Sequence, residues 1–419
     1  MATNRKKRRI LVSKLFTKNK VSDNDQNRNK YDGSNDEIGK GSSSLRVVSG
    51  TKKKRMIRNI ITYSVILLLL LTVIILNILS PTGLVEAVRN KILTFGDGTL
   101  PNNVYCINPE YLSNYNGVTA ILNDSYFELY NSKGKLINAV SHGMSSPSLE
   151  CSEARYLIFD RERYKISVLN YSGELFNREF NKMIISADIG RNGTYAVVTD
   201  SDTYQNAVYV YNKNNENIFT WNSAQYYITD VAVADNGKRI AISLINSKNG
   251  SFESYLYVLD FKSATPKYRY VFDDVVSSIT SCGKEYMIIN GFDQAYSIPW
   301  DGGAESQIAF SGVVRHYDNN VGGLSCVVSG RTDNENINKI FVLNKSGDIL
   351  SSFDFTSNVI DISIFDETVT VLSDSKVYFF DLKGKLVKTS PIETKCKFVA
   401  TVSDNVALVL DNTKLSVLN

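Results

Sequence analysis

Histidine and carboxylate side chains are the groups in this sequence that could move a proton or hold a metal ion. The two histidines, His142 and His316, lie in separate strand repeats without an obvious catalytic partner, so we expect structural or solvated roles for both. Acidic pairs such as Asp200 and Asp202 follow strand-like runs and lack the ligand number of a calcium-binding loop. Neither GxSxG, nor HExxH, nor a P-loop occurs. We therefore predict a non-enzymatic protein that carries no cofactor and no metal ion.

Long polar connections between predicted strands are better candidates for function, because they could bind a partner. Three of them stand out, at residues 200–206, 246–254 and 331–338. Aromatic and arginine side chains on exposed loops are frequent interface anchors. The predicted partner-binding residues are Tyr204, Gln205, Asn249, Phe252, Glu253, Arg331, Asp333 and Asn334. Solvated loops of variable sequence are the alternative interpretation of the same segments.

The elements that would carry these loops are short strands that repeat along the chain. From about residue 100 onward, runs of four to seven apolar or alternating residues are separated by Gly, Asn, Asp or Ser-Gly turns. Four segments align without gaps, each with the end of one strand, a turn in which Gly takes a positive φ, and the start of the next strand. These segments are LYNSKGKLI (129–137), VLNYSGELF (168–176), VLNKSGDIL (342–350) and FFDLKGKLV (379–387).

The spacing of these segments predicts an all-β fold, a β-propeller of radially arranged four-stranded sheets. A strand–turn–strand unit precedes each segment, so one repeat holds four strands over about 35–47 residues. The last repeat has three strands, and residues 99–107 could supply the fourth and close the ring. Two stacked β-sandwiches are the rival fold, but they would not explain so regular a period. We predict eight blades, with seven as the alternative count, near residues 110–140, 147–180, 184–222, 227–273, 275–310, 313–355, 358–390 and 395–419.

Residues 60–79 form a segment long and apolar enough to cross a bilayer. They carry no charge, and 15 of the 20 are Ile, Leu or Val. At about 1.5 Å per residue, a helix of this length spans about 30 Å, the hydrocarbon thickness of a bilayer. Its aliphatic residues contribute roughly −4 to −9 kcal/mol to insertion. We therefore predict a single transmembrane helix within residues 57–80.

The flanks of this helix predict its orientation. Lys52, Lys53, Lys54, Arg55 and Arg58 precede the apolar run, and no basic cluster follows it. Positive charge stays inside, so we expect a plasma-membrane protein with a cytoplasmic N-terminus and an extracytoplasmic propeller at residues 99–419. A cleaved signal peptide is the alternative, but the apolar run is long, begins late and precedes no small-x-small cleavage site.

Two further segments flank the predicted membrane helix. Residues 1–56 are rich in Lys, Asn, Ser, Asp and Gly and cannot bury enough apolar surface, so we expect a disordered basic cytoplasmic tail. Its start, residues 5–16, could contact an anionic leaflet or a cytoplasmic partner, or remain a solvated charge run. Residues 81–98 should form a linker with a short helix, capped by Thr82, whose apolar stripe lies on the membrane or against the outer domain.

Charge and cysteine content narrow the class of protein. Residues 1–58 hold 17 Lys and Arg against 5 Asp and Glu, whereas the rest of the chain holds 30 against 38. The mildly acidic outer domain excludes nucleic acid as an expected partner, because phosphate binding needs a basic surface. Cys106 and Cys396 are the one pair to test for a disulfide, since both lie near the ring closure. We expect the five cysteines to be small buried apolar residues: Cys106, Cys151, Cys282, Cys326 and Cys396.

Three segments carry a family resemblance: LIFDRERYKISVLN (157–170), NGTYAVVTDSDTYQNAVYVYN (192–212) and NIFTWNSAQYYITDVAVADNGKRIAIS (217–243). Through them, residues 82–419 resemble a family of membrane-anchored propellers from Gram-positive bacteria, the domain-of-unknown-function family 5711. Quinoprotein-like and WD-like propellers share parts of the same pattern. The resemblance implies the propeller fold and the membrane topology, and it assigns no catalytic residue, since the family has no assigned activity.

These predictions support three hypotheses on function. In the first, the outer domain is a non-enzymatic scaffold that binds an envelope protein or a cell-wall polymer and is held at the lipid bilayer. In the second, the chain is a single-pass sensor whose propeller binds a ligand and whose basic tail reports it inside. In the third, which has the weakest support, the propeller is a hydrolase or lyase that uses carboxylates in its central channel.

Overall fold

The structure is a computed structural model that describes residues 50–79, 83–115, 117–248, 250–292, 294–303, 306–309, 312–320, 322–331 and 333–418. Most of the predicted tail, residues 1–49, lies outside these residues, as do Thr82 and Asn249.

The apolar segment is a single helix, α1 (Gly50–Leu79). It begins earlier than predicted, because residues 50–56, assigned to the tail from sequence, are helical. Within the described residues it is the only helix long and apolar enough to cross a membrane. Its threonines need no outside partner, since Thr62 and Thr72 donate their hydroxyls to the carbonyls of Arg58 and Leu68, at 2.9 and 2.8 Å.

The linker helix, α2 (Leu84–Leu93), differs from the prediction in its cap, and it exposes most of the predicted apolar stripe. Its N-cap is Gly83, at φ 98°, without a side-chain hydrogen bond. The predicted apolar stripe is exposed at Val85, Val88 and Ile92, whereas Asn90 is buried. The predicted stripe is therefore divided: Leu93 packs against the apolar cluster between blades 1 and 2, and Val85, Val88 and Ile92 are left exposed.

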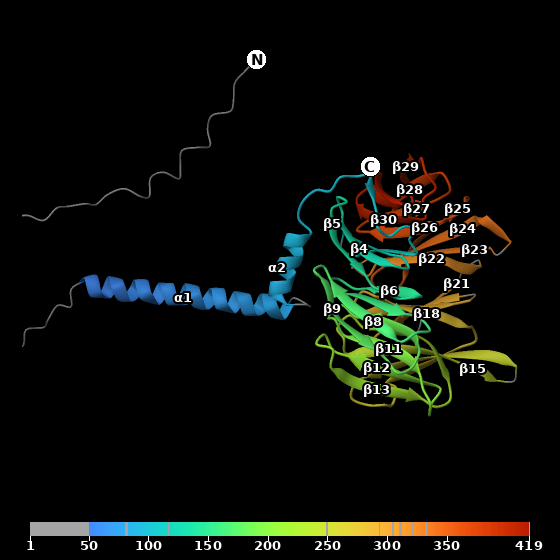
Figure 1. Ribbon diagram of the computed structural model, residues 1–419, viewed down its shortest axis with the longest axis horizontal. Helices are drawn as coiled ribbons and strands as arrows, with labels where there is room; N and C mark the ends of the chain where they lie inside the picture. Colours follow the sequence, from blue (N-terminus) through green and yellow to red (C-terminus); the bar gives the residue numbers. More distant parts are fainter. Residues whose placement is uncertain are drawn as a thin grey trace, which may run out of the picture. The chain divides into compact units, whose positions relative to one another are not determined.

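The rest of the described chain forms eight antiparallel four-stranded sheets, which confirms the propeller and the count of eight blades. Figure 1 shows the strands following one another in the colour order of the sequence. Consecutive strands are neighbours within each sheet, as expected for short hairpin connections. Blade 1 contains β2 (Tyr111–Tyr115), β3 (Val118–Leu122), β4 (Tyr126–Asn131) and β5 (Leu136–Ser141). Blade 2 contains β6 (Pro147–Cys151), β7 (Tyr156–Asp160), β8 (Lys165–Asn170) and β9 (Gly173–Glu179). Blade 3 contains β10 (Ile184–Ile189), β11 (Tyr195–Asp200), β12 (Asn206–Tyr211) and β13 (Asn217–Ser223).

The remaining blades follow in the same order. Blade 4 contains β14 (Tyr227–Val233), β15 (Arg239–Lys248), β16 (Ser251–Asp260) and β17 (Tyr268–Phe272). Blade 5 contains β18 (Val276–Cys282), β19 (Tyr286–Gly291), β20 (Gln294–Pro299) and β21 (Ser306–Ala309). Blade 6 contains β22 (Val313–Asn319), β23 (Ser325–Arg331), β24 (Asn334–Leu343) and β25 (Ile349–Phe355). Blade 7 contains β26 (Asp361–Phe365), β27 (Thr368–Leu372), β28 (Lys376–Asp381) and β29 (Leu386–Pro391).

Blade 8 closes the ring with strands from both ends of the propeller. Its strand order is β1 (Asn102–Asn103), β32 (Lys414–Leu418), β31 (Val406–Leu410) and β30 (Phe398–Ser403). Asn102 pairs with Leu415 and Asn103 with Lys414. The predicted closure by residues 99–107 is thus confirmed, and the outer edge of β32 is paired along part of its length instead of lying open.

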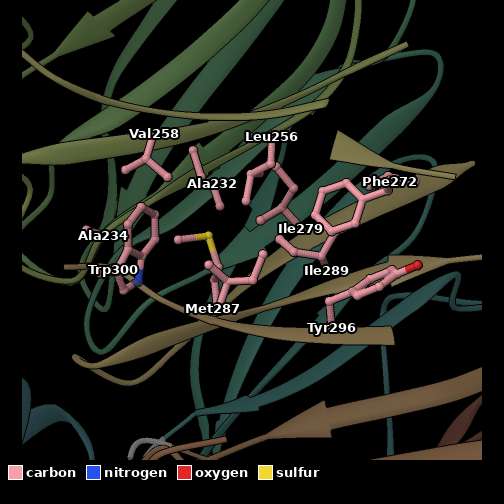
Figure 2. Packing of buried hydrophobic residues seen from close by; sticks show 13 residues of the cluster. Ala232, Ala234, Leu256, Val258, Phe272, Ile279, Met287, Ile289, Tyr296 and Trp300 are labelled. Carbon is pink, nitrogen blue, oxygen red and sulfur yellow. The ribbon is translucent and has the colours of Figure 1, made fainter. Parts of the chain in front are cut away.

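One apolar cluster fills each of the eight gaps between neighbouring blades. The cluster between blades 4 and 5 is typical, with Leu256 and Phe272 from one sheet and Met287, Ile289 and Trp300 from the next (Figure 2). Every sheet is covered on both faces by its neighbours. This explains why the central strands are continuous apolar runs, such as β19, whose residues are all buried.

The gap-free sequence repeat corresponds to the turn between the third and fourth strands of blades 1, 2, 6 and 7. In each, an Asn or Asp side chain accepts hydrogen bonds from backbone N–H groups of the turn, as Asn131 does from Lys133 and Lys135. The Gly in the turn takes the predicted positive φ, for example 73° at Gly134. The same residue types therefore recur in these four segments because the turn needs an Asn or Asp acceptor and a Gly of positive φ.

Glu128 holds the N-terminal strand of the ring in place. This carboxylate is fully buried in β4 and accepts hydrogen bonds from the N–H groups of Tyr105 (3.0 Å) and Cys106 (3.2 Å), just beyond β1. Burial raises the pKa of Glu128, and the two backbone bonds oppose that rise. The side chain thus links blade 1 to the connection that leads out of blade 8.

All five cysteines are free thiols, and four of them are buried. The Cys106 thiol donates to the carbonyl of Tyr126 at 3.1 Å, and Cys396 belongs to a different apolar cluster, between blades 7 and 8. The structure therefore contains no Cys106–Cys396 disulfide and supports their role as small buried residues.

Removal of the Glu128 carboxylate should weaken ring closure. Glu128→Ala leaves the buried Cys106 N–H without an acceptor, at a cost of about 1–3 kcal/mol, and removes the part-buried bond from the Tyr105 N–H as well. We expect a lower midpoint in chemical denaturation of the full-length chain and faster amide hydrogen exchange in residues 102–106. Glu393→Ala, at an exposed side chain between blades 7 and 8, is the matched control. Equal stability of both variants would contradict the assignment of Glu128.

Candidate functional site

Seven of the eight predicted partner-binding residues lie on blades 3, 4 and 6, and the eighth, Asn249, lies outside the described residues. Blades 3 and 4 are neighbours, and the structure brings Tyr204 and Phe252 to the same side of the ring, both exposed. Blade 6 is separated from them by blade 5. Its Arg331 and Asp333 form an ion pair with each other (Nη2–Oδ2 2.7 Å), so this guanidinium already has a partner.

Two of the three predicted loops are mostly strand. β15 and β16 pair from Arg239↔Asp260 out to Lys248↔Ser251, so residues 246–248 and 251–254 form the end of a long hairpin (Figure 1). β24 likewise begins at Asn334. The loop prediction was wrong here because polar side chains on a two-stranded arm can stay in water while the backbone groups pair with each other. Residues 201–205, between β11 and β12, are a loop as predicted.

The connections between second and third strands share one side of the ring with the connections between blades. Three hydrogen bonds join residues at or near the ends of these two kinds of connection. Ile228 N donates to Asn206 Oδ1 (2.7 Å), and Val276 N donates to Ser254 Oγ (3.0 Å). Asn338 Nδ2 donates to the carbonyl of Ser357 (2.8 Å). We call this side the loop face, defined by the residues of these two sets of connections.

Exposed aromatic side chains gather on the loop face. Within the described part of the ring, each strongly exposed Tyr or Phe belongs to one of these connections, to a strand end that adjoins one, or to the channel wall. They are Tyr105, Tyr111, Tyr126, Tyr164, Tyr204, Tyr227, Phe252, Phe292 and, in the channel, Tyr317. A protein surface that concentrates aromatic residues on one side is typical of a binding surface.

Most of these aromatics were missed from sequence, because the prediction selected connections by length. Tyr164 and Phe292 lie in short turns and Tyr126 directly follows one, and these turns drew no attention because they are short. Their position in the repeat could have identified these aromatics from sequence, because each lies where a second strand ends and a third begins. Once blades are aligned, such residues must share a face.

A recess of about 410 Å³ lies on the loop face between blades 5 and 6. Its wall includes Phe292 and Tyr317, together with Val275 and the first two residues of β22, Val313 and Val314. Arg315 stands beside it, with its guanidinium donating to the carbonyl of Glu335 at 2.9 Å. The recess could receive one apolar or aromatic side chain of a partner.

The central channel is the second candidate site, a cavity of about 710 Å³ lined by the first strands of blades 1 to 6. Arg161 is the one basic residue among the described residues of its wall. The acidic side chains of the wall are Glu150, Glu162, Asp188, Asp230, Asp235 and Asp318. The channel therefore favours cations and hydrogen-bond donors over anions.

The aspartates of the first strands link neighbouring blades. Each accepts a hydrogen bond from a backbone N–H on the first strand of the next blade, across a gap where that strand has no sheet partner. The four bonds join Val233 N to Asp188 Oδ2 (2.6 Å), Ile279 N to Asp230 Oδ2 (2.8 Å), Ile364 N to Asp318 Oδ2 (2.8 Å) and Val399 N to Asp361 Oδ2 (2.9 Å). These carboxyl groups thus satisfy backbone donors on the edge of the first strands that has no sheet partner.

Burial dominates the acidity of these carboxyl groups. It raises the pKa of Asp188 and Asp318 to about 7 and that of Asp361 to about 8, against the opposing effect of the backbone bonds. Burial and the nearby Asp188 and Asp230 also raise the pKa of Glu150 well above its usual value. Near neutral pH the channel therefore holds a mixture of protonated and ionised carboxyl groups.

The histidines are remote from such chemistry. His142 is buried, its Nε2 lies 2.9 Å from the carbonyl of Asn123, and its Nδ1 accepts from Met144 N at 3.1 Å. Burial lowers the pKa of His142 and of His316. Among the described residues, no three His, Cys, Asp or Glu side chains are grouped as they would be around a metal ion.

Solved propeller structures resemble this chain in fold. Sqt1 of Saccharomyces cerevisiae matches with a TM-score of 0.52 and 10% identity, over 77% of this chain and 100% of its own. The C-terminal WD40 domain of Sif2 matches with a TM-score of 0.51 and 12% identity, over 76% and 99%. AztD of Citrobacter koseri matches with a TM-score of 0.50 and 13% identity, over 73% and 90%. At such identities the likeness shows the fold alone.

No curated protein matches the sequence. Residues 107–418 match the model of a family of unknown function, DUF5711.

The raised pKa values of the channel aspartates predict a stability that falls as pH rises. An aspartate in the unfolded chain titrates near 3.9, so the folded ring binds more protons than the unfolded chain between about pH 4 and pH 8. In that window the free energy of unfolding should drop by on the order of 3 kcal/mol or more, measured by denaturation of the full-length chain in detergent. Asp361→Asn should make the decline shallower, and Asp404→Asn, on an exposed turn, should not. A stability that rises between pH 5 and pH 8 would contradict the argument.

Proposed function

The chain belongs to the family of unknown function DUF5711, as the sequence predicted, and we propose that it is a non-enzymatic, membrane-anchored binding protein whose propeller captures a partner protein on its loop face. The observation that carries the proposal is the gathering of exposed aromatic side chains on that face.

The aromatic residues supply the binding energy in this proposal. Tyr and Phe offer large apolar areas with little conformational entropy to lose, and alanine scans find such residues among the dominant contacts of interfaces. Tyr204, Phe252 and Phe292 lie on the consecutive blades 3, 4 and 5, so one partner could contact all three. The recess between blades 5 and 6 continues this arc and could hold an anchoring side chain.

The charge of the site favours a basic partner. The described channel wall carries six acidic side chains, some of which are ionised near neutral pH, and one arginine, and its mouth opens among the aromatics at Glu162 and Tyr227. Electrostatic complementarity raises association rates and excludes partners of the wrong charge. A protein segment rich in Lys or Arg would match this potential.

The channel carboxyl groups do not need a catalytic role to be explained. Four first-strand aspartates hold backbone N–H groups of the next blade, so they serve the ring itself. The geometry of the ring explains where these carboxyl groups lie, and burial explains why their pKa values are raised. The hydrolase or lyase hypothesis therefore gains no support from their presence.

Membrane attachment through α1 completes the proposal. Its side chains from 54 to 76 are exposed, as expected for a helix whose natural solvent is lipid. The basic residues before it favour a cytoplasmic N-terminus, which would display the propeller outside the cell. The partner would then be an envelope protein, and a cell-wall polymer is the alternative that the experiment below distinguishes.

Site-specific photo-cross-linking in intact cells tests the proposed surface. Benzoylphenylalanine is placed at Phe252, or in turn at Tyr204 or Phe292, in the full-length chain. We expect a discrete adduct that protease removes and muramidase leaves intact. The matched control is Ile349, which is exposed at the start of β25, away from the loop face, and should give no such adduct.

Serine substitutions complete the same test. With the reporter at Tyr227, the double variant Phe252→Ser and Phe292→Ser should lower the adduct yield at least tenfold, because truncation of a dominant aromatic contact costs about 2 kcal/mol or more. An adduct that muramidase dissolves would identify a wall polymer in place of a protein. The absence of any adduct at all three loop-face positions would refute the proposed surface.

A further inference from the structure

The polar side of α2 docks on the propeller. Glu86 accepts hydrogen bonds from Arg155 Nη2 (2.8 Å) and Asn170 Nδ2 (2.8 Å), and Arg155 Nη1 adds a second bond to the same carboxylate. Arg155 is buried, and both it and Asn170 belong to blade 2. Burial alone would raise the pKa of Glu86, but these hydrogen bonds and the nearby charge of Arg155 lower it. The ion pair is therefore a fixed, bidentate contact.

The end of α2 is held in the same way by blade 1. Asn131 Nδ2 donates to the carbonyls of Thr94 (2.9 Å) and Gly96 (2.8 Å). Lys135 Nζ donates to the carbonyls of Leu93 (3.2 Å) and Phe95 (2.7 Å). A helix C-terminus favours such donors because its last carbonyls lack partners within the helix. Both ends of α2 are thus fastened to the ring.

These contacts all lie on the side of the ring opposite the loop face. Arg155 sits in the turn between first and second strands, and Asn131, Lys135 and Asn170 sit at turns between third and fourth strands. Such turns alternate with the loop-face connections along each antiparallel sheet. We call this side the helix face.

The outward side of α2 is apolar and uncovered by the described chain. Val85 is 82% exposed, Ile92 is 67% exposed and Val88 is also exposed, followed by Phe95 at 82%. At about 100° per residue, the three helical positions fall within an arc of about 60°, roughly opposite Glu86 and Asn90. Arg89 and Lys91 fall on the two sides of that arc. Apolar residues flanked by basic ones are the pattern of a helix that lies in a membrane interface.

The short connection between α1 and α2 indicates what could cover the exposed apolar side of α2. Only residues 80–83 separate α2 from α1, and five consecutive Cα–Cα steps extend at most about 18 Å. A helix so close to the end of a transmembrane segment begins in or near the headgroup region, which is about 5–8 Å thick on each side of the hydrocarbon. The bilayer that would hold α1 is therefore within reach of the exposed face.

We propose that the outward face of α2 lies in the lipid interface next to α1 and that α2 mounts the propeller with its helix face toward the membrane. This inference rests on the proposed membrane anchoring. Because α2 is fastened to blades 1 and 2, the mount is stiff, and it directs the aromatic loop face away from the bilayer toward a partner in the envelope. The occupant of the face is lipid, and a second copy of the chain is the alternative.

Quenching by brominated lipid tests the contact. Val88→Trp and Ile92→Trp are made separately in the full-length chain and reconstituted into phosphatidylcholine–phosphatidylglycerol vesicles with brominated acyl chains. After subtraction of the wild-type signal of Trp221 and Trp300, we expect at least a twofold loss of the added fluorescence. Phe252→Trp, on the loop face, is the matched control and should keep its fluorescence.

Flotation of the same vesicles separates the two proposals. If the chain does not float with the vesicles, the membrane anchoring fails and the mount fails with it. If the chain floats and the tryptophans at positions 88 and 92 stay unquenched, the anchoring stands and the lipid contact is overturned. A disulfide-linked dimer of Val88→Cys, in the absence of quenching, would assign the face to a second copy and also overturn the inference.

Loss of the buried ion pair tests the stiffness of the mount. Arg155→Gln should release α2 from blade 2, so that amide hydrogen exchange in residues 84–95 of the reconstituted chain speeds up more than tenfold while the blades stay protected. Quenching of the Ile92→Trp reporter should persist, because the lipid contact does not depend on the ring. Arg191→Gln, which breaks the nearby Arg191–Glu153 pair, is the control and should leave α2 protected. Unchanged exchange in Arg155→Gln would show that the ion pair does not hold the helix.

Discussion

Pairing of β1 with β32 is the constraint on which the rest of the propeller depends, because an unpaired strand edge would leave the ring open between its first and last blades. The strand Asn102–Asn103 contributes only two residues, yet it sits where blade 8 needs a fourth strand. Glu128 and the apolar cluster between blades 8 and 1 fix the segment that follows it. With the ring closed, every sheet is covered on both faces and all eight gaps can be filled by apolar side chains.

Closure also gives the molecule two different faces. The antiparallel sheets send alternate connections to opposite sides, so any feature tied to one type of turn repeats on one side only. The helix face receives α2 through polar and charged contacts around Arg155 and Asn131. The loop face is left free and carries the exposed aromatics. In our proposal this division separates attachment from recognition.

The central channel shows how a structural requirement can resemble a catalytic site. First strands crowd around the axis, and their backbone N–H groups on the channel side have no sheet partner. Aspartates such as Asp318 and Asp361 supply acceptors to the next blade and become weak acids because they are buried. Their raised pKa values follow from closing a ring of eight blades, and this separates them from carboxyl pairs tuned for proton transfer.

The sequence by itself determined the apolar helix, the blade boundaries, the closing strand and the turns with Asn131 or Asp381, because each depends on local periodicity or on a short turn motif. It also identified Tyr204 and Phe252 as exposed. Only the tertiary structure decided that Tyr164 and Phe292 share their face, that residues 246–248 and 251–254 extend a hairpin, and that α2 turns its polar side inward to Arg155. The reason is physical: hydrophobic periodicity reports which residues share a face of one element, and it does not report what that face meets. In our proposal α2 lies next to a lipid bilayer, and this would explain why it reverses the usual rule, with charge buried in a bidentate pair and Val85, Val88 and Ile92 left outside.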